Sequence, residues 1–143
     1  MPYRIEESPG FPLYRVNMRL RALGTQLLRP YGLTPEQFAV LATLCNRDGM
    51  SQRELADLLV KDRPNMTRIL DKLQHKGLVE RRSHPQDRRI CQVYATAAGQ
   101  DLVARLAPVV LEARERMFGA LSGREKATLR RLLEKLFRSL EGL

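Results

Sequence analysis

The stretch Lys61–Arg82, KDRPNMTRILDKLQHKGLVERR, carries two rows of side chains with opposite character on one predicted helix. One row is apolar and recurs every three or four residues, which is typical of a helix face packed on a core. Its members are Met66, Ile69, Leu70 and Leu73. The other row is rich in hydrogen-bond donors and consists of Asn65, Thr67, Arg68 and Lys72. Few acids accompany this donor row, so we expect it to face a ligand; the alternative is an ordinary solvated helix face.

Capping and terminating residues mark the ends of this helix and predict two more helices before it. Asp62 is expected to cap the helix, Pro64 to occupy its first turn and Gly77 to end it. The two preceding helices should each begin with a capping box, a Ser or Thr followed three residues later by Glu or Gln. These pairs are Thr34 with Gln37 and Ser51 with Glu54. The Asp48-Gly49 pair should end the first of the two helices.

After Gly77 the residue pattern changes from helical to alternating. LVERR (78–82) and RICQVYAT (89–96) contain β-branched, aromatic and alternating residues, and the turn-forming SHPQD (83–87) lies between them. We therefore predict a two-stranded β-ribbon with a basic tip.

Four arginines of this ribbon are candidates for contacts with a polyanion. At the tip, Arg88 and Arg89 follow Asp87, whose carboxylate can hold a guanidinium in a rotamer suited to a narrow minor groove. Arg81 and Arg82 on the incoming strand are expected to contact phosphates, which position a protein on DNA without specifying sequence.

The charge of the chain favours nucleic acid as the partner. Among 143 residues, 25 Lys and Arg oppose 16 Asp and Glu, which gives a formal net charge of +9. Such an excess indicates a polyanion, nucleic acid ahead of an anionic membrane. Three short helices followed by a basic ribbon are typical of a winged helix-turn-helix, whose third helix enters the major groove of double-stranded DNA. There Asn can pair with adenine, Arg with guanine and the Thr methyl with thymine.

Apolar stripes at helical spacing mark both ends of the chain. An extended arm is expected over residues 1–12, before the first stripe; Thr96 should open a long helix, and Ser122 with Glu125 should cap the last one. One chain could bury these stripes in an internal core, but the central segment has a small core of its own. We therefore expect two copies to share the stripes.

The predicted fold is mainly α with a small β-ribbon, and it has three parts. Residues 1–33 are the N-terminal arm and first dimerisation helix, residues 34–95 the winged helix-turn-helix lobe, and residues 96–143 the C-terminal dimerisation helices.

The sequence resembles the multiple antibiotic resistance regulator (MarR) family of bacterial transcription factors. The matching segments are LTPEQFAVLATL, SQRELADLL, MTRILDKLQHKGLVERR and DRRICQVYATAAGQDL, in the family's order and spacing across about residues 13–143. The most specific element is Asp87–Arg89 with Thr96 at the start of the next helix. The resemblance implies a homodimer that reads a palindromic operator through two winged lobes, and we expect a sequence-specific repressor.

The resemblance also implies roles for individual residues. The positions that face the major groove in the family match Pro64, Asn65, Thr67 and Arg68. Arg89 matches the arginine that reaches the minor groove. Ser51 and Gln52 are expected to contact phosphate through hydroxyl, amide and helix-end N–H groups.

Family members often release DNA when a small phenolic or lipophilic effector enters a pocket between the dimer helices and the winged lobe. Such an effector shifts a conformational equilibrium only by its differential affinity for the two states. The candidate pocket residues, each of which could equally belong to the core, are Tyr14, Met18, Tyr31 and Phe38.

Catalysis and cofactor binding are disfavoured. Ser83, His84 and Asp87 have the side chains of a catalytic triad but lie within five residues on one turn, where no rigid base or oxyanion hole is evident. Cys45 and Cys91 lack CxxC spacing, and the chain has 2 histidines, so no metal or other cofactor is expected.

Without an apolar run of signal-peptide or membrane-spanning length, the protein is expected in the cytoplasm, away from membranes. One further alternative remains, an architectural protein that coats DNA without reading sequence. It would need the positive charge but not Asn65 and Arg68 at helical spacing.

Overall fold

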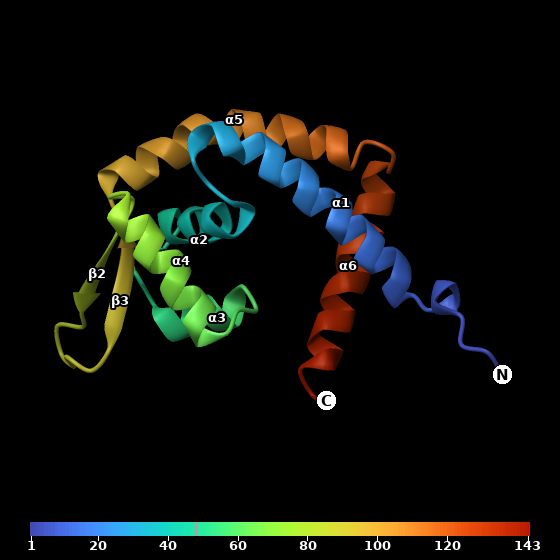
Figure 1. Cartoon of the computed structure of the whole chain (residues 1–143), viewed down its shortest axis with the longest axis horizontal. Coiled ribbons are helices and arrows are strands. Elements are labelled where there is room, and N and C mark those ends of the chain that lie inside the picture. The colour runs from blue at the N-terminus through green and yellow to red at the C-terminus, as the bar shows by residue number, and fades with distance from the viewer. Residues whose placement is uncertain (48) are drawn as a thin grey trace. The chain divides into compact units, whose positions relative to one another are not determined.

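The computed structural model describes residues 1–47 and 49–143, and it is mainly α-helical with a small sheet, as predicted (Figure 1). The elements are η1 (Ile5–Glu7), α1 (Gly10–Leu28), η2 (Arg29–Tyr31), α2 (Pro35–Cys45), β1 (Met50–Ser51), α3 (Gln52–Leu58), α4 (Arg63–His75), β2 (Val79–Ser83), β3 (Cys91–Ala95), α5 (Ala97–Met117) and α6 (Gly123–Leu140). The chain forms two compact units, residues 1–107 and 108–143.

The first helix begins earlier than predicted. α1 starts at Gly10, so Pro12 lies in its first turn and not in an extended arm. Proline fits there because the N–H groups of a first turn have no partner within the helix. The helix ends at Leu28, and Gly32 follows with φ +72, a left-handed conformation that glycine adopts without strain.

The predicted starts of α2, α3 and α4 are confirmed. Thr34 and Ser51 each form a capping box, and the Asp62 side chain caps α4. α2 ends at Cys45, and Asp48, predicted with Gly49 to end it, lies outside the described residues.

The core of the first unit contains the apolar row of α4. Met66, Leu70 and Leu73 are fully buried, whereas Ile69 is half-buried. Side chains of α2, α3, β3 and α5 are equally buried, namely Leu41, Leu55, Val93 and Leu106. Because Met66, Leu70 and Leu73 are buried to this extent, the opposite face of α4 is fixed towards solvent.

Within the part of the chain that the structure describes, the sheet has three strands, in the order β1-β3-β2, and not the two predicted. β2 pairs with β3 antiparallel, and β1 pairs with the other edge of β3 through Met50↔Val93 and Ser51↔Gln92. A strand of two residues is too short to show alternation in sequence, so only tertiary pairing reveals it.

The start of α5 is tied to the end of α4. The Thr96 hydroxyl donates to the Gly77 carbonyl at 2.7 Å and accepts from the Gly99 N–H at 3.1 Å. A Cβ on Gly99 would lie 2.2 Å from the Leu78 carbonyl oxygen, so this close approach requires glycine.

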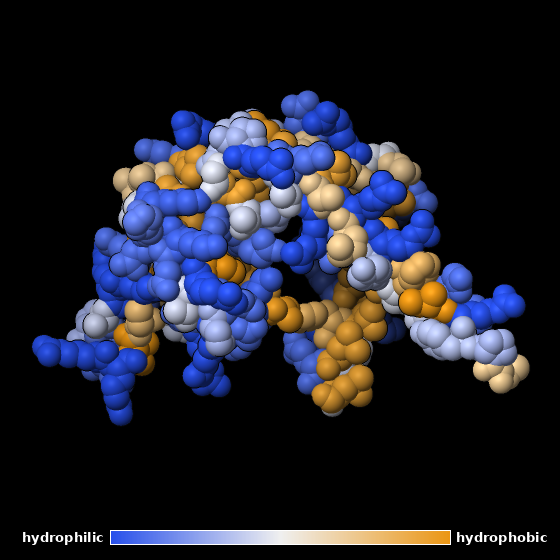
Figure 2. All heavy atoms as spheres, in the orientation of Figure 1, coloured by the Kyte–Doolittle hydropathy of each residue, from blue (hydrophilic) through white to orange (hydrophobic). Residues whose placement is uncertain are grey.

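The second unit consists of the rest of α5, from Pro108, and α6. Ser122 and Glu125 form the predicted capping box of α6. An apolar stripe of α6 is 40–53% exposed, and Figure 2 shows apolar residues gathered over this helix. Its members are Leu132, Leu133, Leu136, Phe137 and Leu140. No helix among residues 1–47 and 49–143 is long and apolar enough to cross a membrane.

Candidate nucleic-acid interface

The turn between α3 and α4 has a specific backbone geometry. The Val60 N–H donates to Asp57 and the Lys61 N–H to Ala56, the pair of bonds that closes a helix around a left-handed residue. Val60 occupies that position with φ 53 and is exposed. The chain then enters α4 at Asp62, so this turn sets the direction of the donor-bearing helix.

Asp62 organises the first turn of α4. Its Oδ1 accepts from the Asn65 backbone N–H at 2.8 Å, and its Oδ2 accepts from Asn65 Nδ2 at 2.6 Å. These bonds, led by the backbone one, hold the pKa of the Asp62 carboxyl below its usual value, and the Arg68 charge adds to the effect. The Asn65 side chain is thereby fixed at the N-terminal end of the helix, beside the exposed Pro64.

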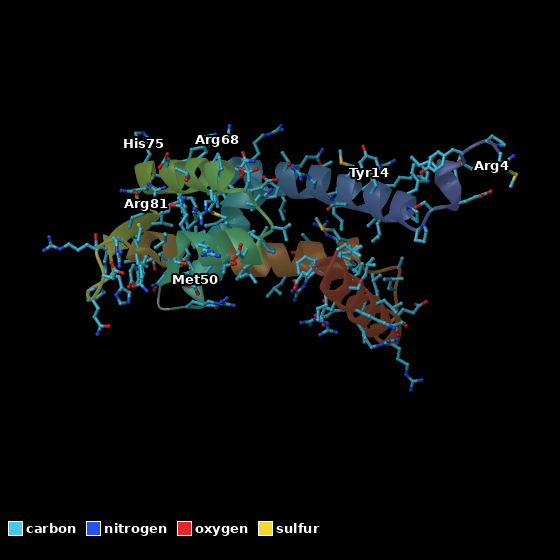
Figure 3. The ribbon with its side chains drawn as sticks, turned by 90° about the horizontal axis from the view of Figure 1, so that it is seen from below. Arg4, Tyr14, Met50, Arg68, His75 and Arg81 are labelled. Atoms are coloured by element: carbon cyan, nitrogen blue, oxygen red, sulfur yellow. The ribbon has the colours of Figure 1, made fainter. Side chains whose placement is uncertain are left out.

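Asn65 and Arg68 are brought together on the surface of α4. Arg68 Nη2 donates to Asn65 Oδ1, and the rest of the Arg68 side chain is exposed. In Figure 3, Arg68 and His75 project from the same edge of α4. Within the donor row, Arg68 and Lys72 are exposed, whereas Asn65 and Thr67 are half-buried.

Lys72 extends the same basic surface by one turn. It is exposed and lines a polar groove of ≈ 400 Å³ together with Asn65, Arg68, Lys61 and Arg21, among others. Lys61 and Arg21, which the sequence did not single out, line the same groove, where Arg21 is paired with Glu36 at 2.8 Å.

Thr67 faces α3 more than was expected. It is half-buried, and its hydroxyl accepts from Gln52 Nε2. Gln52 is thus directed at α4, whereas Ser51 accepts from the Glu54 N–H at 3.0 Å to cap α3. Both predicted phosphate contacts, Ser51 and Gln52, have these intramolecular bonds.

The wing between β2 and β3 holds one arginine in a defined position. Arg89 donates to Asp87 Oδ1 from its backbone N–H at 3.0 Å and from Nε at 3.1 Å, and to Oδ2 from Nη2 at 3.2 Å. The Arg89 side chain is 91% exposed. Its side-chain bonds, followed by its backbone N–H, lower the pKa of the Asp87 carboxyl. Arg88 is exposed beside it.

The two arginines of β2 have intramolecular partners. Arg82 forms an ion pair with Glu80 and lies over the Tyr94 ring, 4.5 Å from its centroid. Arg81 is 23% exposed and binds Asp71 at 2.7 Å, so its guanidinium is turned to α4 and not outward. The phosphate contact expected of Arg81 stays a prediction, and in this structure Asp71 already binds its guanidinium. The sequence did not predict the Arg81–Asp71 ion pair, because only tertiary packing brings these two residues within reach of each other.

The effector candidates lie on three elements of the first unit. Tyr14 and Met18 of α1 are 61% and 48% exposed, Tyr31 of η2 is 39% exposed, and Phe38 of α2 is half-buried. Tyr14 and Met18 are therefore not core residues within a single chain.

Taken together, α3, the Val60 turn, α4 and the wing define a winged helix-turn-helix DNA-binding protein. Residues 33–91 match the model of the MarR family. An HTH-type transcriptional repressor of Mycobacterium tuberculosis is 34% identical over 132 residues, which cover 92% of this chain and 95% of that protein. The chain belongs to the MarR family of transcriptional regulators.

Solved structures agree with this assignment. A variant of Escherichia coli MarR in complex with operator DNA has a TM-score of 0.82 and 31% identity, and the match covers 89% of this chain and 91% of that one. Bordetella bronchiseptica BpsR, described as regulated in DNA binding by 6-hydroxynicotinic acid, has a TM-score of 0.87 and 27% identity, with 95% and 97% covered.

Proposed function

We propose that this protein is a homodimeric repressor that reads a palindromic operator with α4 and the wing of each lobe. The observation that carries the proposal is the bonded Asn65–Arg68 pair, in which Asn65 is half-buried and Arg68 exposed, on a helix whose other face is buried in the core. In a major groove an amide at this place can donate to adenine N7 and accept from its N6 amino group, and a guanidinium can donate to both N7 and O6 of guanine. Thr67 can offer its methyl to thymine, and Lys72 can contact phosphate.

The wing supplies the second contact. Asp87 already restrains the Arg89 side chain while leaving it exposed. Entry of the guanidinium into a narrow minor groove therefore costs little further side-chain entropy. Arg88 and Arg82 are suited to the flanking phosphates, since such contacts set register without reading bases. Ser51 and Gln52, at the start of α3, are further candidates for phosphate contact.

The apolar stripe of α6 supports a dimer. A stripe of five large side chains at 40–53% exposure is unusual for a chain that functions alone. We assign residues 1–33 and 96–143 to dimerisation and residues 34–95 to DNA binding. A two-fold dimer would place its α4 helices in half-sites about 34 Å apart, one turn of duplex.

Release by a small effector is the remaining part of the proposal. BpsR, at 27% identity, is described as regulated by 6-hydroxynicotinic acid, which makes small aromatic acids reasonable first probes. The exposed Tyr14 and Met18, with Tyr31 and Phe38, are the candidate contacts.

Selection of bound fragments from genomic DNA tests the proposal. Enrichment of a palindrome, with tighter binding to it than to random duplex at every salt concentration, is the expected result. Equal affinity for all sequences would favour an architectural protein. A reporter downstream of the palindrome should be transcribed less when the protein is present; increased transcription would contradict the repressor role.

A further inference from the structure

One acid interrupts the basic surface of α4. Asp71 is the only acidic residue between Asn65 and His75, and its side chain is 58% exposed. An unpaired carboxylate on a helix that approaches DNA would repel the phosphates. The negative charge of Asp71 therefore works against the proposed function unless another group neutralises it.

Arg81 of β2 is the group that neutralises Asp71. Its Nη1 donates to Asp71 Oδ1 at 2.7 Å, and its Nη2 donates to the Thr67 carbonyl oxygen at 3.2 Å. These two acceptors lie one helical turn apart, and a planar guanidinium can bind both at once, whereas an ammonium group lacks this fork. The Arg81 side chain is 23% exposed and its Nε is buried, so it lies against the helix (Figure 3).

Thr67 is held from a second side by α3. Gln52 Nε2 donates to the Thr67 hydroxyl, while Arg81 binds the carbonyl of the same residue. α3 and β2 thus fix the same turn of α4, the turn that also carries Arg68. Base contacts require the orientation of a recognition helix to be held to within about 10–20°. These bonds hold the orientation of α4 and therefore of the side chains that would read bases.

We infer that Arg81 is a positioning residue for base reading: it fixes α4 against the wing and neutralises Asp71, and it does not itself contact DNA. The inference rests on the proposed reading of bases by α4. It also replaces the phosphate role that the sequence suggested for Arg81. The preference for operator over random DNA then depends on Arg81, although Arg81 lies beside the DNA interface and not in it.

A double-mutant cycle on the full chain tests the inference. Arg81→Met, Asp71→Asn and the double variant are compared with the parent chain for binding to the selected palindrome and to random duplex, across a salt series. Each single variant should lower the ratio of the two affinities about tenfold, and the double variant should lower it no further, because the same positioning interaction is lost in all three. Arg81→Met alone also leaves the Asp71 charge unpaired, so it should weaken binding to random duplex as well, but less than binding to the palindrome. The salt slope should not change, since no phosphate contact is removed.

Two matched variants sharpen the result. Arg82→Met removes the neighbouring arginine of the same strand and should weaken binding to both duplexes equally, with a salt slope smaller by about one. Arg81→Lys keeps the positive charge but cannot bind Asp71 and the Thr67 carbonyl at once. Compared with Arg81→Met, it should therefore recover the affinity for random duplex but only part of the ratio of operator to random affinity.

Three results would overturn the inference. Equal losses on both duplexes with a reduced salt slope would make Arg81 a phosphate contact. A lower midpoint of thermal unfolding with an unchanged affinity ratio would make the pair purely structural. Additive losses in the double variant would show that Asp71 and Arg81 act separately. If the parent chain itself does not distinguish the palindrome from random duplex, the proposed function fails first, and that failure is seen before any variant is made.

Discussion

The carboxylate of Asp87 accepts three hydrogen bonds from Arg89, one from the backbone N–H and two from the guanidinium, while the Arg89 side chain stays 91% exposed. A charged side chain in open solvent is usually free to move. Here both oxygens of one carboxylate fix it, which is the arrangement that a minor-groove contact needs.

Arg89→Ala should weaken operator binding mainly where the flanks of the site are AT-rich, because a narrow minor groove has the most negative potential there. Asp87→Asn should weaken the same binding less, since the guanidinium remains but is held less firmly. Fluorescence anisotropy with AT-rich and GC-rich flanks measures both effects. An Arg89→Ala loss that does not depend on the flanks would count against insertion into the groove.

The pKa of the Asp87 carboxyl should be below the ordinary value of about 3.9, because Arg89 stabilises its charged form. This interaction stabilises the folded chain at pH above that ordinary value, and the contribution is lost as pH falls through the lowered pKa. Carboxyl NMR titration reports it directly. In Arg89→Ala the backbone N–H remains, so the pKa should return only part of the way; no change at all would show that the side chain does not hold the carboxylate.

Arg68→Ala should cost about 1–3 kcal/mol on the operator and relax the sequence preference at the base pair that it reads. Lys72→Ala is the comparison, because loss of a phosphate contact weakens binding to every sequence alike and reduces the salt slope by about one. Titrations on operator and random duplex distinguish the two. Equal losses for Arg68→Ala on both duplexes would remove its base-reading role.

Val60→Gly should raise the free energy of unfolding by about 1 kcal/mol, because Val60 is held at φ 53, where a residue with a Cβ is strained and glycine is not. Val60→Ala is the matched control, since it shortens the side chain but keeps the cost of the left-handed backbone. Urea denaturation measures both free energies. If alanine stabilises as much as glycine, side-chain exposure and not the backbone is the cause.

Leu136→Asp should abolish or strongly weaken the dimer, because it would bury an unpaired charge among the apolar side chains of two α6 helices. Lys135→Asp, one residue away and outside the apolar stripe, should leave the dimer intact. Light scattering over a concentration series gives the mass of each variant. A dimeric Leu136→Asp protein would mean that this part of α6 is not the interface.

Local sequence patterns determined most of the helical framework. Capping boxes at Thr34, Ser51 and Ser122 are satisfied within four residues, so they act independently of the rest of the fold. The apolar period of α4 likewise predicts its buried face, because helix geometry alone puts Met66, Leu70 and Leu73 on one side. Asp87 and Arg89 are two residues apart, so the sequence alone also predicted their contact.

Only the tertiary structure decided which polar groups bind one another across elements. β1 is too short to carry a pattern, and its two residues become a strand because the edge of β3 is available. Gln52 with Thr67, and Arg81 with Asp71, are 15 and 10 residues apart, so local spacing cannot reveal these pairs. The physical reason is that hydrogen bonds and ion pairs form between groups that packing brings within about 3 Å, whereas a sequence records only the distance along the chain.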